Sequence, residues 1–97
     1  MSRWRKKPVV IEAWRFVAAG QREKLPGWVD PRWFYCDVAG EPDRPRIVEP
    51  QAAHYMLIPT HEGTLRASMG DWIIRGVHGE VYPCKPEVFA LTYERAD

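Results

Sequence analysis

The chain contains few cysteines and no long apolar segment. Two of its 97 residues are cysteine, Cys36 and Cys84, and without a Cys-x-x-Cys spacing they predict free thiols rather than a disulfide framework or a zinc site. No run approaches the roughly 20 apolar residues of a membrane-spanning helix. The basic start leads into a strand-like segment and lacks the apolar region of a signal peptide. We therefore expect a cytoplasmic protein without a membrane partner.

An excess of charge of one sign is also missing. The chain has 14 lysines and arginines against 13 aspartates and glutamates, which gives a formal net charge of +1. This balance argues against binding nucleic acid through bulk electrostatic attraction. The charge is nevertheless uneven, because basic residues gather at the start of the chain, at Arg3, Arg5, Lys6 and Lys7. Contact with nucleic acid through this basic segment therefore stays open as an alternative.

Motifs that carry catalysis or bind metal ions are absent as well. The sequence has no His-x-x-x-His pair and no glycine-rich phosphate loop, since Gly76 and Gly79 span a predicted hairpin. An enzyme would have to use Cys84, Glu80 and His54, whose spacing matches no known catalytic arrangement. We therefore expect a protein that is not an enzyme and that holds neither a metal nor a cofactor.

Aromatic residues and arginines, in contrast, are abundant. The chain has 5 tryptophans, 4 tyrosines and 3 phenylalanines, and ten of its 14 basic residues are arginine. Guanidinium groups suit planar, bidentate recognition of phosphate or carboxylate. So many tryptophans cannot all be buried in a small core, and some are expected at a ligand or at a subunit boundary. A GC-rich genome would explain the arginine excess equally well.

The remaining composition, 45% hydrophobic and 28% charged, predicts one globular domain over residues 1–97. Apolar alternation and β-branched residues predict about six short strands. Proline and glycine predict an exposed loop over 39–50. Two short helices are expected over 18–24 and 85–89. The expected strands cover 7–16, 33–36, 55–60, 64–68, 72–77 and 80–84, with a final edge strand at 91–93.

These elements predict an α+β fold: a small, mainly antiparallel twisted sheet or partly open barrel with one or two short helices. The second half is rich in hairpins. We expect turns at 61–63 and 69–71 and a two-residue connection at His78 and Gly79. Gly63 and Gly79 stand where a positive φ is needed.

Strand alternation also predicts a candidate binding surface. Arg66 would share a face with Thr64 and Ser68, and Tyr82 with Glu80 and Cys84. We predict that Arg66, Arg75, Glu80 and Tyr82 converge on one sheet surface, where guanidinium groups bind phosphate and a ring stacks on a base. The alternative is a set of solvated cross-strand pairs, such as Arg75 with Glu80. A register change of one residue would reverse these facing assignments.

Three segments resemble a group of small proteins encoded by phages and prophages. They are Lys-Pro-Val-Val-Ile-Glu-Ala at 7–13, Ile-Pro-Thr-His-Glu-Gly-Thr-Leu at 58–65, and Gly-Asp-Trp-Ile-Ile-Arg-Gly-Val-His-Gly-Glu-Val-Tyr-Pro-Cys-Lys-Pro-Glu-Val-Phe at 70–89. The group often has Pro or Val where Met69 stands and Tyr where Trp72 stands, and residues 17–54 have no counterpart. The resemblance implies a phage or prophage origin, a compact protein in the host cytoplasm and no known enzymatic activity.

By analogy with the lifestyle of other small phage proteins, we expect a homo-oligomer that sequesters a nucleotide-like signal of host immunity. We predict that Arg66, Arg75 and Lys85 contact phosphates and that Trp72 and Tyr82 stack or build the pocket, with Glu80 beside them. The alternative is a protein–protein interaction module, either a virion accessory component or an inhibitor of a host protein. Its exposed tryptophans would then anchor the interface.

Overall fold

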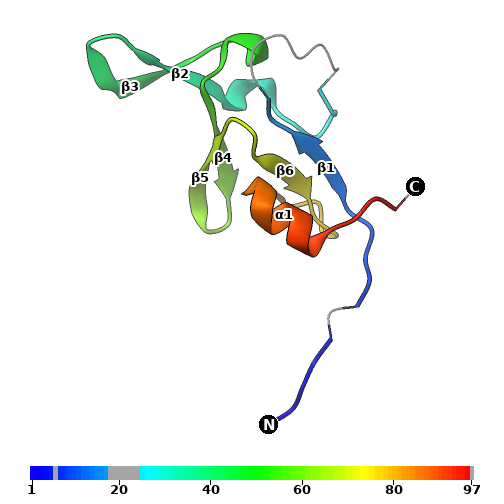
Figure 1. Cartoon of the computed structure of the whole chain (residues 1–97). Helices are drawn as coiled ribbons and strands as arrows, with labels where there is room; N and C mark the ends of the chain where they lie inside the picture. The colour runs from blue at the N-terminus through cyan, green and yellow to red at the C-terminus, as the bar shows by residue number, and fades with distance from the viewer. Residues whose placement is uncertain (6, 18–24, 97) are drawn as a thin grey trace.

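The computed structural model describes residues 1–5, 7–17 and 25–96 (Figure 1). Within them the fold is small and α+β, with mostly antiparallel strands, one α-helix and two 3₁₀ helices. The helix expected over 18–24 lies outside the described residues. The strands are β1 (Glu12–Arg15), β2 (Phe34–Val38), β3 (Glu41–Ile47), β4 (Tyr55–Thr60), β5 (Gly63–Ser68), β6 (Trp72–Arg75) and β7 (Val81–Cys84); the helices are η1 (Pro31–Trp33), η2 (Pro50–Ala52) and α1 (Pro86–Thr92).

The described strands form two sheets rather than one. The three-stranded sheet has the order β1-β6-β7, and the four-stranded sheet has the order β3-β2-β4-β5. All strand pairs are antiparallel. The β4–β5 hairpin confirms the pairing predicted for 55–60 and 64–68, with Gly63 at φ 104°. The two sheets meet at the β5–β6 turn, where the Phe16 N–H donates to the Asp71 carbonyl at 2.9 Å.

The expectation of a loop over 39–50 is wrong, because Glu41–Ile47 forms β3. This strand pairs only with β2 and therefore lies at a sheet edge. Prolines are tolerated on an edge strand, where a missing N–H costs no ladder bond. Gly40, at φ 81°, makes the turn into β3. The resulting hairpin projects from the body of the molecule (Figure 1).

Two other boundaries differ from the expectation. The final edge strand over 91–93 is wrong, since α1 continues to Thr92 and the Tyr93 N–H caps it by donating to the Phe89 carbonyl at 2.9 Å. The first strand covers Glu12–Arg15 instead of 7–16. The residues before it run away from the body as an extended segment (Figure 1). A strand-forming sequence needs a partner strand before it becomes part of a sheet.

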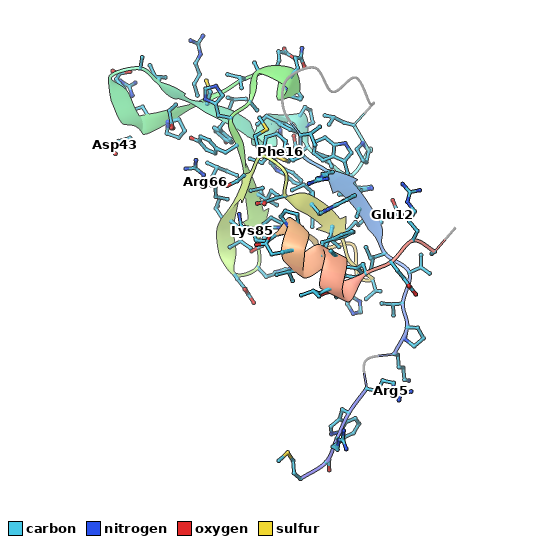
Figure 2. All side chains as sticks on the ribbon, viewed as in Figure 1. Arg5, Glu12, Phe16, Asp43, Arg66 and Lys85 are labelled. Atoms are coloured by element: carbon cyan, nitrogen blue, oxygen red, sulfur yellow. The ribbon has the colours of Figure 1, made fainter. Side chains whose placement is uncertain are left out.

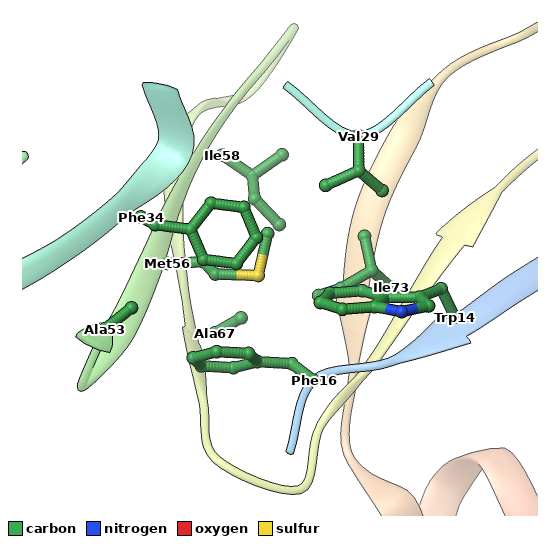
Figure 3. Packing of buried hydrophobic residues seen from close by; sticks show 9 residues of the cluster. All are labelled: Trp14, Phe16, Val29, Phe34, Ala53, Met56, Ile58, Ala67 and Ile73. Carbon is green, nitrogen blue, oxygen red and sulfur yellow. The ribbon is translucent and has the colours of Figure 1, made fainter. Parts of the chain in front are cut away.

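The core lies between the two sheets (Figure 3). Phe34 meets Trp14 and Phe16 edge-on, with ring centroids 6.1 and 5.9 Å apart, as aromatic rings prefer. Each sheet thus buries one face against the other. The cluster comprises Trp14, Phe16, Val29, Phe34, Ala53, Met56, Ile58, Ala67 and Ile73.

Helix α1 packs on the opposite face of the three-stranded sheet. The register pairs Trp72 with Cys84 and Ile74 with Tyr82, so these four side chains share one face. Trp72 stacks on Phe89 of α1, with ring centroids 4.2 Å apart and planes 9° from parallel. None of the helices in the described part of the chain is long and apolar enough to cross a bilayer.

Candidate functional site

The predicted site residues do not converge on one surface. Arg66 belongs to β5 of the four-stranded sheet, whereas Arg75 and Tyr82 belong to the three-stranded sheet. Arg75 lies opposite Val81, and Tyr82 lies opposite Ile74. Because neighbouring residues of a strand point to opposite faces, Arg75 and Tyr82 face away from each other. The predicted convergence of Arg66, Arg75, Glu80 and Tyr82 is therefore wrong.

A one-residue difference in register causes the change in facing. A two-residue connection at His78 and Gly79 would have paired Arg75 with Tyr82. In the structure the connection runs over residues 76–80, the Gly76 N–H donates to the Glu80 carbonyl at 2.8 Å, and Arg75 pairs with Val81. Such a shift moves a whole strand's side chains to the other face.

Arg66 lies over an aromatic pair on the four-stranded sheet (Figure 2). Its guanidinium carbon is 4.1 Å from the centroid of the Tyr55 ring, and Tyr55 stacks with Tyr35 at 6.2 Å. The Tyr55 hydroxyl donates to Asp37 at 3.0 Å. Burial, together with this hydrogen bond, raises the pKa of Tyr55. Tyr55 is only 4% exposed, and Arg66 covers its ring through a cation–π contact.

Arg75 forms an ion pair across the sheet. Its Nη1 lies 3.5 Å from Glu12 Oε1, and the Trp28 indole N–H donates to Glu12 Oε2 at 2.9 Å. The partner of Arg75 is therefore Glu12 rather than Glu80. Both members of the pair are partly exposed, which limits the pair to a fraction of a kcal/mol.

Glu80 and Lys85 take part in local structure. The Glu80 carboxylate accepts the His78 N–H at 2.9 Å, within its own turn. The Lys85 ammonium donates to Asp71 Oδ2 at 2.9 Å. Asp71 is only 3% exposed and also accepts the Ser68 N–H at 2.8 Å. The Lys85 ammonium is therefore paired with a buried carboxylate, while the Lys85 side chain itself is 54% exposed.

The remaining predicted residues, Trp72 and Tyr82, do share a face, beneath α1. Burial of Tyr82 and its hydrogen bond with Tyr93 raise the pKa of Tyr82 to about 12. Phe89 and Tyr93 continue the aromatic series, with ring centroids 5.1 Å apart. Trp72, Phe89 and Tyr93 thus form one aromatic wall, and Tyr82 supports it from the sheet.

An open groove of about 1010 Å³ runs along this wall. One side is formed by residues 9–11 and by Ala13 and Arg15, and the other by α1 and the residues after it. The Arg15 guanidinium lies 5.7 Å from the Trp72 ring centroid, and Arg15 Nε donates to the Gly70 carbonyl at 3.1 Å. Arg95 lines the same groove.

Arg15 and Arg95 are basic residues that the sequence reasoning missed. Alternation along the first strand puts Val9, Ile11 and Ala13 on one face, and Arg15 continues that face. A basic residue at the end of an apolar face was therefore a usable signal. Arg95 follows α1, and no pattern in the sequence predicts that it lies in the groove.

The environment of Cys84 does not favour a nucleophile. Burial raises the pKa of its thiol, and the nearby Asp71 and Glu87 carboxylates add to the effect. A reactive cysteine requires the opposite shift. In the described part of the chain, no group of three or more His, Cys, Asp or Glu side chains could hold a metal ion.

Comparisons with protein-family models, with curated proteins and with solved structures gave no match.

Proposed function

We propose that this protein is a non-enzymatic binding protein that takes a nucleotide-like ligand in the groove between residues 9–15 and α1. The observation that carries the proposal is that Arg15 and Arg95 line the same groove as Trp72, Phe89 and Tyr93. Guanidinium groups bind phosphate in bidentate fashion, and aromatic and apolar side chains accept a base or sugar. Both requirements are thus present on one surface.

The size and polarity of the groove also support this proposal. Small-molecule sites usually combine apolar lining with a few polar groups in a volume of roughly 300–1,000 Å³, and the groove of about 1010 Å³ is at the upper end. Val9, Val10 and Ile11 supply apolar lining. A ligand with two phosphate groups would use both Arg15 and Arg95.

The proposal changes the residues expected to contact phosphate. Arg66, Arg75 and Lys85 contact Tyr55, Glu12 and Asp71. They do not line the groove, whereas Arg15 and Arg95 do, so the phosphate contacts move to these two arginines. Trp72 keeps the predicted role of building the pocket, because it lines the groove, whereas Tyr82 lies beneath α1 and is not among the lining residues. Stoichiometric binding of this kind suits a prophage accessory protein that removes a host immune signal from solution, a role proposed by analogy with other small phage proteins.

Calorimetric titration with a panel of cyclic and linear nucleotides tests the proposal. We expect one class to bind the wild type and Arg95→Ala to weaken that binding about tenfold or more, since a charge-assisted hydrogen bond contributes about 1.5–3 kcal/mol. Arg44→Ala is the control, because Arg44 lies on the β2–β3 hairpin and pairs with Glu41 at 3.6 Å. Binding by no nucleotide, or equal binding by the Arg95→Ala protein, would refute the proposal.

Failure of that titration would favour the second candidate, a protein–protein interaction module. Val88 and Leu91 lie one turn apart on α1 and are exposed, Leu91 to 90%. Two exposed apolar residues on one side of a helix are typical of a surface that contacts another protein.

A further inference from the structure

Within the described part of the chain, the three-stranded sheet has an edge that no strand pairs with. In its order, β1-β6-β7, β1 has a neighbour on one side only. The chain before β1 extends away from the body (Figure 1), and we call residues 7–11 the β1 extension. No hydrogen bond joins the backbone of residues 7–10 to any described residue. Its sequence, Lys-Pro-Val-Val-Ile, is nevertheless typical of a strand.

The β1 extension also exposes apolar side chains. Val9 is 47% exposed and Val10 79%, and Trp4, which precedes this segment in the chain, is 92% exposed. Removing such apolar side chains from water favours association. A partner that covers the β1 extension thus gains both backbone hydrogen bonds and apolar burial.

The accessible surface of the whole chain indicates how much area a partner could cover. The chain exposes 7784 Å², whereas a compact monomer of its mass of 11.3 kDa exposes about 5,700 Å². Its radius of gyration is 15.2 Å, against about 12.5 Å for a compact domain of this length. The excess of roughly 2,000 Å², which the projecting β2–β3 hairpin shares with the N-terminal segment (Figure 1), is more than the about 800 Å² that each partner contributes to a standard interface.

We propose that a second copy of this chain covers this edge, with the β1 extensions of the two copies paired antiparallel about a twofold axis near Val9. Under twofold symmetry the same segment of each copy pairs with its counterpart, so each copy adds a strand to the sheet of the other. The paired β1 extensions then join the two three-stranded sheets at their β1 edges. This pairing requires no ligand and can be tested without nucleotide, although Val9, Val10 and Ile11 also line the proposed groove.

The pairing also determines the relative orientation of the two copies. A twofold axis that relates adjacent antiparallel strands is perpendicular to the sheet, so each face is kept. Val9, Ile11 and Ala13 of both copies therefore lie on the same side as both α1 helices. The two grooves, each lined by Arg15 and Arg95, therefore lie on the same face.

Measuring the mass in solution, without added nucleotide, tests this pairing. The wild type should be a dimer. Val10→Lys should be a monomer with unchanged circular dichroism, because Val10 is exposed in the single chain and a lysine on an edge strand opposes pairing with a further strand. The control is Val77→Lys. Val77 is 60% exposed in the β6–β7 connection, and this variant should stay a dimer.

A cysteine cross-link tests the register. In a background with Cys36→Ser and Cys84→Ser, Val9→Cys should form a disulfide between copies under mild oxidation, and Val77→Cys should not. A monomeric wild type across the micromolar range would overturn the proposal, as would a Val10→Lys dimer or a dimer that Val9→Cys fails to cross-link. A wild-type monomer that binds duplex DNA would instead assign the segment with Arg3, Arg5 and Lys7 to nucleic-acid contact.

Discussion

At the scale of single residues, Lys85 shows how a cation can connect elements that are distant in the chain. Its ammonium meets Asp71, which is buried in the turn between β5 and β6. Removing one member of such a pair leaves the other charge buried without compensation. Lys85 thereby fixes the end of β7 against that turn, next to the start of α1.

Tyr82 gives a pH dependence at the same scale. Its pKa is raised to about 12 in the folded protein, against about 10 in the unfolded chain. Folding therefore favours the neutral phenol. Its contribution to stability is complete below about pH 10 and is lost as the pH rises to about 12.

We therefore predict that the free energy of unfolding falls between about pH 10 and about pH 12 and that Tyr82→Phe makes this fall shallower, because phenylalanine cannot ionise. Urea unfolding of both proteins across this range measures the effect. If the free energy of unfolding fell equally in the two proteins, ionisation of Tyr82 would not be the cause of the fall.

The position of single residues could be predicted only where the register was known. Trp72 and Tyr82 were expected beside the pocket, and both lie beneath α1. Arg75 was assigned to the wrong face because the connection is longer than two residues. Hairpin alternation is a local property of the sequence, but register depends on the hydrogen bonds of the turn.

At the scale of elements, the β6–β7 connection depends on contact between Gly76 and Glu80. A side chain at position 76 would collide with the Glu80 carboxylate, which accepts the His78 N–H. Glycine therefore leaves room for the carboxylate to bind the turn. The constraint at Gly76 is one of space, since Gly76 is not among the glycines with positive φ.

We predict that Gly76→Ala and Glu80→Ala each destabilise the protein by about 1 kcal/mol, because each loses the same hydrogen bond. The double variant should cost about as much as either single variant, which is non-additive. Gly27→Ala is the control, since an added methyl group there meets nothing within 4 Å. Chemical denaturation measures all four variants, and strictly additive costs would contradict this account.

Elements defined by local signals were easier to predict than those defined by distant partners. The β4–β5 hairpin is set by Gly63 and by alternation within a few residues. The strand β3 exists because β2 pairs with it, although Pro42 and Pro45 argue against a strand. The segment 7–11 shows the converse, a strand-like sequence without a partner in the single chain.

At the scale of the whole molecule, one core serves both sheets. Phe34 of the four-stranded sheet contacts Trp14 and Phe16 next to the three-stranded sheet. It is fully buried, so truncating it leaves a cavity that both sheets line. The two sheets should therefore lose their structure together.

We predict that Phe34→Ala lowers the free energy of unfolding by about 3–5 kcal/mol and that unfolding stays a single transition. Tryptophan fluorescence and circular dichroism, followed in the same titration, should give coincident curves. Leu91→Ala is the control; Leu91 is exposed, and its truncation should change stability by no more than about 0.5 kcal/mol. Two separated transitions would mean that each sheet folds with its own core.

Pro83 has a consequence for how large an assembly can become. It lies in β7, the second edge of the three-stranded sheet, and proline on an edge strand offers no N–H to an incoming chain. If copies join through β1, each uses the edge that can accept a strand and leaves β7 at both outer ends. Growth then terminates at two copies, so this sheet can pair without giving rise to fibres.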